Sequence, residues 1–203
     1  MAARVAREDA GTAARILDVA ERLVQVRGFN GFSYADIAAE LGITKAALHY
    51  HFAGKADLGE ALIARYASRF IEALGRVDAT AETASVRLAG YADLYLQVLR
   101  NRKMCLCGML AAEYQTLPQP MQDAVVRFFD QNESWLAAVL ELGRADGSLQ
   151  FGGTARDTAR LIIGSLEGAM LVTRPYGDAG RFQAVAANLL AGLARAAAAP
   201  AVG

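Results

Sequence analysis

The chain has 203 residues, of which 54% are hydrophobic, and its 21 basic side chains are balanced by 21 acidic ones. This hydrophobic content excludes a disordered chain, and the charge balance excludes a uniformly basic surface. No stretch has the pattern of a signal peptide or the length of a membrane-spanning helix, and two cysteines are too few for a secreted disulfide framework. We therefore expect a cytoplasmic protein with no membrane partner, in which a nucleic acid would be bound by a local patch.

Helices are favoured throughout, because alanine is abundant and the first 117 residues contain no proline. Residues 12–27 carry apolar side chains at the spacing of an amphipathic helix, and a flexible arm is expected over residues 1–10. Ser33, with Asp36 three residues later, forms a variant of the capping box and predicts a short helix that ends at Leu41.

A second short helix is predicted over residues 45–51, with Thr44 as its N-cap. Two helices of this length are unstable alone and need the helix over residues 12–27 behind them, which is the layout of a helix-turn-helix. In that layout Gly42 is expected to take a positive φ in the turn, and Leu48 to anchor the second helix.

The fold class predicted for the whole chain is all-α, with about nine helices. A helix-turn-helix domain of three helices is expected over residues 1–55, and a second helical domain over residues 56–203. The helices predicted for the second domain span residues 56–74, 85–100, 104–116, 121–144, 154–173 and 179–197.

The outward face of the second short helix combines small side chains with hydrogen-bond donors. It consists of Thr44, Lys45, Ala46, Ala47, His49 and Tyr50. The first two stand at the helix N-terminus, where backbone N–H groups favour phosphate, and the alanines allow close approach to base edges. Lys55 adds a second point for phosphate. Such a helix fits a DNA major groove more readily than a protein core.

The sequence FSYADIAAELGITKAALHYHFAGKADLGEALIARY, residues 32–66, resembles the DNA-binding region of TetR-family transcriptional repressors. The resemblance implies that the DNA backbone is approached by Ser33, Tyr34, Thr44, Tyr50 and Lys55, and that the bases are faced by Lys45, Ala46, Ala47 and His49. The family usually has tyrosine at the position of His49, which raises the question whether this contact depends on pH.

The family resemblance also implies a function. It implies a repressor without a cofactor that binds a palindromic double-stranded DNA operator as a homodimer and is released by a small-molecule inducer. The net charge of residues 1–60 is −1, so non-specific affinity for DNA should be weak and strongly salt-dependent. Specificity would then depend on the dimeric geometry.

The last two predicted helices are the candidates for a two-fold interface, because pairs of helices from each chain commonly form dimers. The predicted interface residues are Ile162, Ile163, Leu166, Met170, Phe182, Val185 and Leu189. The same residues would also suit the core of a single chain.

An inducer pocket is implied by the resemblance for the middle of the chain, which is rich in aromatic and sulfur-containing side chains. The candidate lining residues are Tyr91, Tyr95, Cys105, Cys107, Glu113, Phe128, Trp135, Glu167 and Met170. The two glutamates would orient the ligand, although each of these side chains also suits a core.

The two cysteines leave a structural and a sensing role open. Cys105 and Cys107 follow Arg102 and Lys103, whose positive charge would favour a reactive thiolate, whereas a buried cysteine is usually inert. On a helix the two side chains would point about 200° apart, which disfavours a disulfide between them. The sequence RKMCLCGMLAAE also resembles the N-ethylmaleimide reductase repressor subgroup, which responds to electrophiles.

An enzyme is not expected. The sequence has no glycine-rich phosphate loop, and both histidines lie more than 50 residues from the cysteines. His49 and His51 would also point about 200° apart on their helix, so they form no metal site. The alternative to a repressor is a dimeric thiol-based electrophile or redox sensor, or an adaptor that does not bind DNA.

Overall fold

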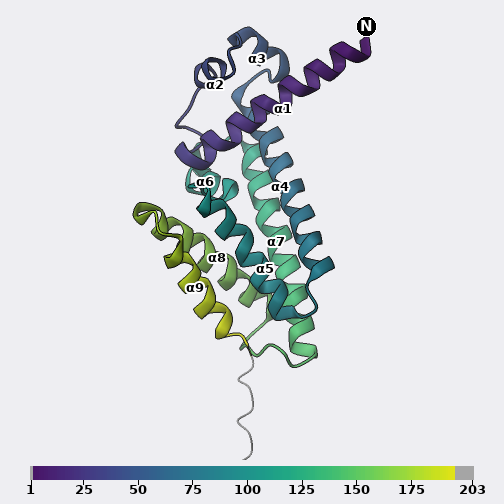
Figure 1. The fold of residues 1–203 in the computed structure, drawn as a ribbon, viewed down its shortest axis with the longest axis vertical. Helices are drawn as coiled ribbons and strands as arrows, with labels where there is room; N and C mark the ends of the chain where they lie inside the picture. The colour runs from purple at the N-terminus through teal and green to yellow at the C-terminus, as the bar shows by residue number, and fades with distance from the viewer. Residues whose placement is uncertain (1, 195–203) are drawn as a thin grey trace, which may run out of the picture. The chain divides into compact units, whose positions relative to one another are not determined.

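The computed structural model describes the backbone of residues 2–194 and the side chains of residue 9 and residues 11–194. This part of the chain forms nine α-helices and two short 3-10 helices, and it contains no strand, only an isolated bridge between Leu149 and Ala194 (Figure 1). None of its helices is long and apolar enough to cross a membrane. The predicted all-α class is confirmed.

The four N-terminal helices are α1 (Ala2–Arg27), α2 (Tyr34–Leu41), α3 (Lys45–His51) and α4 (Lys55–Thr80). Both short helices occur where they were predicted, and α3 has the predicted bounds. In contrast, α1 begins at Ala2, where we expected a flexible arm, because alanine-rich sequence without proline or a cap continues the helix beyond its apolar stripe. The helix α4 also extends beyond the predicted residue 74, to Thr80.

The later helices are α5 (Ala84–Arg100), α6 (Leu106–Ala112), α7 (Gln119–Ala145), α8 (Ala155–Thr173) and α9 (Ala179–Ala191). The 3-10 helices are η1 (Tyr114–Thr116) and η2 (Arg174–Tyr176). The helix predicted over residues 104–116 is shorter than expected, because Cys105 is its N-cap and Glu113 its C-cap. The helix predicted over residues 179–197 ends at Ala191, and its last three positions lie outside the described residues.

The chain divides into two compact units, and α4 and α7 each run through both. The first unit contains the described residues up to Ile71 together with residues 102–128, and the second contains residues 72–101 together with the described residues from Phe129 onward. The segment that carries α6 therefore belongs to the same compact unit as the two short helices. Our division into a DNA-binding domain over residues 1–55 and a ligand-binding domain over residues 56–203 stays a prediction about function.

Each unit has its own apolar core. In the first unit, Ile16, Leu23, Ile37, Leu48 and Leu62 are at most 2% exposed and come from four different helices. In the second unit, α5, α8 and α9 pack against one another. Burial of these side chains supplies the stability that helices as short as α2 and α3 lack alone.

Candidate nucleic-acid interface

The N-terminus of α2 is held by the predicted capping box. The backbone N–H and the hydroxyl of Ser33 both donate to Asp36 Oδ2, at 2.7 Å each. These hydrogen bonds lower the pKa of the Asp36 carboxyl below its ordinary value, with a smaller contribution from the charge of Arg27. The carboxylate thus stays ionised at the start of α2 and fixes where the helix begins.

The turn between α2 and α3 has the predicted geometry. Gly42 takes φ +66°, a left-handed conformation that favours glycine, and its N–H donates to Ala38 O. Thr44 then caps α3, since its hydroxyl accepts from Ala47 N at 3.1 Å. Leu48 is fully buried and is the buried residue of α3. One anchor and one cap therefore set how α3 is presented.

The opposite face of α3 is uncovered. Lys45, Ala46, His49 and Tyr50 are all exposed, and Tyr50 is 75% exposed. Their spacing places them on one side of the helix. Ala47 is half-buried beside this face. The face has the size and the donors that a DNA groove accepts.

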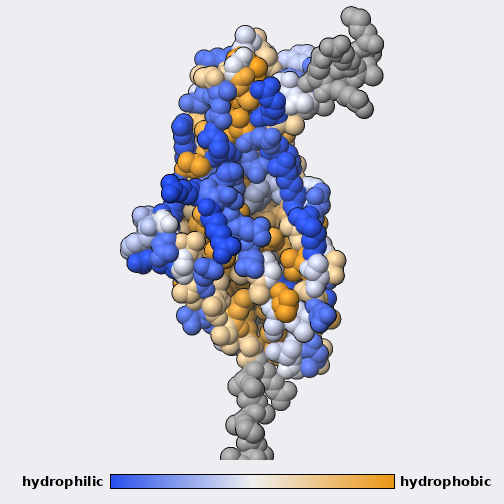
Figure 2. Space-filling view, viewed as in Figure 1, coloured by the Kyte–Doolittle hydropathy of each residue, from blue (hydrophilic) through white to orange (hydrophobic). Residues whose placement is uncertain are grey.

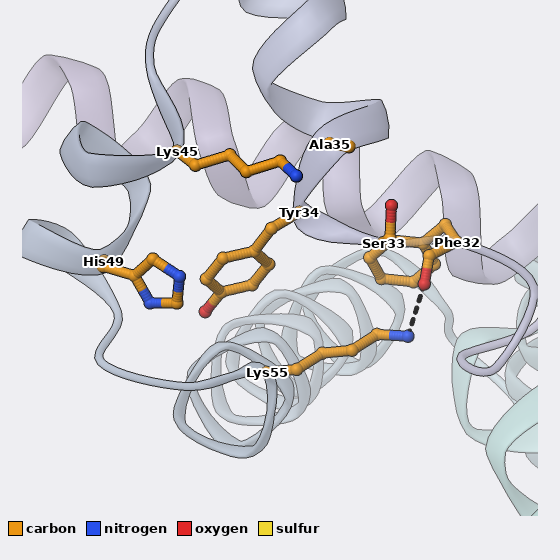
Figure 3. A pocket seen from close by; sticks show the side chains of 7 residues that line it. All are labelled: Phe32, Ser33, Tyr34, Ala35, Lys45, His49 and Lys55. Carbon is orange, nitrogen blue, oxygen red and sulfur yellow. Dashed lines mark hydrogen bonds between the residues drawn. The ribbon is translucent and has the colours of Figure 1, made fainter.

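An open pocket of about 410 Å³ lies beside this face. It is lined by Phe32, Ser33, Tyr34, Ala35, Lys45, His49 and Lys55. Figure 3 shows Lys45 and Lys55 on either side of the Tyr34 ring, with the His49 ring beside the hydroxyl end of Tyr34. Three basic side chains and the start of α2 thus surround a space open to an anion.

Two of the pocket residues that we predicted to contact the DNA backbone are engaged within the fold. The Tyr34 hydroxyl donates to the carbonyl oxygens of Phe52 and Gly54, at 3.0 and 2.7 Å, and only 9% of the residue is exposed. Burial, reinforced by the charge of Asp57, raises the pKa of Tyr34 to about 12, so the phenol is neutral. Tyr34 therefore joins α2 to the turn that precedes α4.

Lys55 is the second of these residues. Its ammonium donates to the carbonyl oxygens of Phe29 and Phe32. It also lies 4.6 Å from the centroid of the Phe29 ring and 4.3 Å from that of the Phe32 ring. Burial lowers the pKa of Lys55, while the charges of Glu113 and Asp36 oppose that shift. Lys55 lines the pocket and at the same time holds the loop before α2.

His49 has a defined orientation. Its Nδ1 lies 2.9 Å from Ala53 O, and its ring lies 4.9 Å from the Tyr34 ring. A carbonyl oxygen only accepts, so Nδ1 carries a hydrogen. Nε2 has no hydrogen-bond partner among the described residues, so it is the ring nitrogen that can meet DNA.

Several acidic side chains of this unit are paired with arginines. Asp18 and Glu21 each lie 2.8 Å from Arg65, and Glu40 pairs with Arg22. Lys45, by contrast, makes no ion pair or hydrogen bond with the part of the chain that the structure describes. The net charge of −1 therefore does not describe the α3 face, where Lys45 is an uncompensated cation.

Comparison with known proteins identifies the family. A model of bacterial regulatory proteins of the tetR family matches residues 16–62, and a model of the tetracyclin repressor-like C-terminal domain matches residues 84–189. The chain belongs to the TetR family. It is therefore a transcriptional regulator with a helix-turn-helix, as the sequence predicted.

Solved structures of TetR-family regulators resemble this chain over nearly its whole length. A regulator from Agrobacterium tumefaciens has a TM-score of 0.89 at 32% identity, covering 92% of this chain and 100% of that one. One from Legionella pneumophila has a TM-score of 0.81 at 34% identity, covering 88% and 95%. The reduced form of E. coli NemR shares the fold, with a TM-score of 0.81 at 22% identity, covering 92% and 99%.

Likeness to a curated relative is confined to one segment. The HTH-type transcriptional regulator TtgR of Pseudomonas putida is 40% identical over 63 residues, which are 31% of this chain and 30% of TtgR. The match thus spans less than a third of that relative.

The predicted dimer residues of this TetR-family chain fall on two different faces. Ile162, Leu166, Met170 and Phe182 are at most 1% exposed and form the core of the second unit. We correct their assignment, because side chains buried within one chain are not available to a partner. Val185 is 44% exposed, and Ile163 and Leu189 are half-buried.

The exposed apolar face of α8 is the one opposite this core. It consists of Leu161, Gly164, Gly168, Leu171 and Val172. An added Cβ at either glycine would meet no atom within 4 Å. In Figure 2, apolar side chains lie on the surface over α8 and α9. The sequence could not choose between the two faces, because α8 is apolar on both.

The predicted ligand residues are divided between the two units. Tyr91, Tyr95, Trp135, Glu167 and Met170 belong to the second unit. There the Tyr91 hydroxyl lies 3.1 Å from both the Tyr95 hydroxyl and Asn132 Oδ1, and the Tyr91 ring stacks on Trp135. Sequence reasoning missed Asn132, a buried polar residue on α7. No motif distinguishes such an asparagine from a surface one.

The other four predicted ligand residues, Cys105, Cys107, Glu113 and Phe128, belong to the first unit. Cys105 and Cys107 are both at most 1% exposed. Cys105 precedes α6, so the predicted helical separation of the two cysteines does not apply, and its sulfur accepts from Gly108 N. Phe128 packs against the rings of Tyr66 and Phe70.

Glu113 is engaged with the loop before α2. One of its carboxylate oxygens accepts from Phe29 N at 2.6 Å. This pairing joins residues 84 positions apart, and no sequence pattern signals it.

Proposed function

We propose that this TetR-family regulator binds a palindromic DNA operator as a homodimer, represses transcription there, and is released when a small molecule binds its helical C-terminal part. The observation that carries the proposal is the uncovered face of α3, where Lys45 has no partner among the described residues and small alanines lie beside it. We assign DNA contacts to Ser33, Thr44, Lys45, Ala46, Ala47, His49 and Tyr50, while Tyr34 and Lys55 hold these residues in place.

Dimerisation is proposed through the outer face of α8 together with Val185 of α9. Leu161, Leu171 and Val172 are 57%, 60% and 66% exposed, and contiguous exposed apolar side chains mark protein interfaces. One recognition helix contacts few base pairs, so a two-fold pair with half-sites about 34–36 Å apart is needed for specific binding.

For the inducer, we propose the cluster of the buried Tyr91, Tyr95 and Asn132 with the half-buried Trp135 as part of the site. Ligand pockets combine apolar and aromatic walls with a few polar groups that fix orientation. The two phenols and the amide supply such groups within an aromatic surrounding. A mainly apolar molecule with one hydrogen-bonding group fits this chemistry.

The experiment is a titration of the gene's own upstream DNA by fluorescence anisotropy at several salt concentrations, with wild type, Lys45→Ala and Arg127→Ala. Arg127 is the matched control, since it is exposed and also carries a positive charge in the first unit. We expect Lys45→Ala to weaken binding about tenfold and to lower the salt slope of the dimer by about 2, since each lost phosphate contact lowers it by about 0.9.

Arg127→Ala should bind DNA as the wild type does. Equal binding of the upstream fragment and a scrambled fragment by the wild type would contradict the proposed function. Lys55→Ala is avoided as a test of DNA contact, because it would also release the carbonyl groups of Phe29 and Phe32.

A further inference from the structure

The loop 28–32, which joins α1 to α2, has few hydrogen bonds of its own. Within it, Gly31 N donates to Gly28 O at 3.3 Å. The helices that follow have eight and seven residues and are too short to hold their own position. The orientation of α2 and α3 relative to α1 therefore depends both on their packing in the core and on what fixes this loop.

The N–H groups of the loop are bound by the turn that follows α6. Glu113 Oε2 accepts from Phe29 N at 2.6 Å, and both carboxylate oxygens lie 3.3 Å from Asn30 N. The Asn30 amide donates to Thr116 Oγ1 at 2.7 Å, and that hydroxyl donates to Glu113 O. Hydrogen bonds to an ionised acceptor are about twice as strong as neutral ones, so Glu113 is the main partner.

The carbonyl groups of the same loop are bound by a cation. Lys55, the first residue of α4, donates to Phe29 O and Phe32 O. Phe29 thus has its N–H on a carboxylate and its C=O on an ammonium. The negative carboxylate thus meets the positive N–H end of one peptide dipole, and the positive ammonium meets the negative C=O end of the next.

Gly28 shows how closely the carboxylate approaches the loop. Its φ is +84°, and a Cβ added there would lie 2.6 Å from Glu113 Oε1. Glycine is therefore required for its conformation and for the space that Glu113 occupies. The carboxylate that contacts this loop is the one predicted from sequence to orient the ligand.

We propose that Glu113 is a positioning residue for operator binding: its carboxylate fixes the loop 28–32 against Lys55 and so links the segment of α6 to the orientation of α2 and α3. The inference rests on the proposed function. Phe32 and Lys55 line the pocket beside α3, so one loop separates Glu113 from the surface assigned to DNA. A displacement of the turn after α6 changes that surface through Phe29.

The test compares wild type, Glu113→Gln, Glu113→Ala and Asp123→Asn. Asp123 is an exposed acidic residue of the same unit. Its carboxylate accepts from Gln119 Nε2 in the preceding turn of α7, so it makes a local contact only and its variant is the matched control. Three quantities are measured: the dissociation constant for the upstream DNA, its salt slope, and hydrogen exchange at the amides of Phe29 and Asn30. Gel filtration reports the oligomeric state.

We expect Glu113→Ala to weaken operator binding about tenfold, the effect of losing a hydrogen bond to a charged group. Its salt slope should stay that of the wild type, because no phosphate contact is lost, whereas Lys45→Ala lowers the slope. Exchange at Phe29 and Asn30 should accelerate. Glu113→Gln keeps one acceptor oxygen and should be intermediate, so it carries the test if the alanine variant does not fold.

Three results would overturn the inference. In the first, both Glu113 variants bind the operator as tightly as Asp123→Asn does. In the second, Glu113→Ala lowers the salt slope as Lys45→Ala does. In the third, hydrogen exchange at the amides of Phe29 and Asn30 is unchanged. Failure of the proposed function is a different outcome, because the wild type itself then binds no upstream DNA.

Discussion

The outer faces of α3 and α8 are both uncovered, and they differ in chemistry. On α3 the exposed residues are a lysine, an alanine, a histidine and a tyrosine, and the helix is held by one buried leucine. On α8 the exposed residues include three large aliphatic side chains and two glycines. A polar face with small side chains suits a hydrated polyanion, whereas an apolar face gains free energy only by covering itself with another protein surface.

A comparison of the two helices also shows when a sequence pattern identifies the buried side of a helix. α3 has a single large aliphatic residue, Leu48, so its inner side is unambiguous. α8 carries apolar residues at two stripes on opposite sides, one centred on Ile162 and Leu166 and the other on Leu161 and Leu171. Both have the spacing of a helix, and only packing distinguishes them.

The largest effect is expected from Leu171→Glu. The substitution places a charge in the proposed apolar interface, where an unpaired charge costs at least about 3 kcal/mol, or about a hundredfold in dimer affinity. Operator binding should fall with it, since the two half-sites are then bound separately. Analytical ultracentrifugation measures the dimer, and anisotropy measures the binding of DNA.

Leu142→Glu is the control for Leu171→Glu. Leu142 lies on α7 in the same unit and is 55% exposed, close to the 60% of Leu171. It should leave the dimer intact. A fully dimeric Leu171→Glu variant would remove the outer face of α8 from the interface.

A smaller effect, with opposite signs in two measurements, is expected from Gly164→Ala. The new methyl group meets no atom within 4 Å in the chain, so higher helix propensity should add about 1 kcal/mol to the stability of the helix. At a close helix–helix contact the same methyl should cost about 1–3 kcal/mol in dimer affinity by overpacking. Gly75→Ala on α4, also in open space, should give the first effect alone. Thermal unfolding and ultracentrifugation separate the two, and an unchanged dimer would argue against close packing at Gly164.

Much of the helix-turn-helix was predictable because its signals are local. Gly42 and Thr44 act on neighbouring residues, and α3 has the predicted bounds. The start of α1 and the end of α4 were not predictable in this way, since no proline or clear capping pattern marks either boundary.

The exposure of Lys45 and Tyr50 was predictable from the pattern of α3, and their contacts with DNA stay predictions. Contacts between distant residues were not predictable, because no local pattern signals them. The ammonium of Lys55 donates to Phe29 O, 26 positions away, and the carboxylate of Glu113 accepts from Phe29 N, 84 positions away. The phosphate contact predicted for Lys55 and the ligand contact predicted for Glu113 also stay predictions.

The smallest effect concerns His49, a polar residue of the exposed α3 face. Its Nδ1 donates to Ala53 O, which leaves Nε2 as the ring nitrogen for a hydrogen bond with DNA. His49→Ala removes that hydrogen bond and should weaken operator binding severalfold, the effect of losing one ordinary hydrogen bond. His49→Tyr, which restores the usual residue of the family, keeps a hydrogen-bonding group and should bind like the wild type. Anisotropy titrations at constant ionic strength measure all three proteins, and equal binding by the wild type and His49→Ala would exclude a role for His49 in DNA binding.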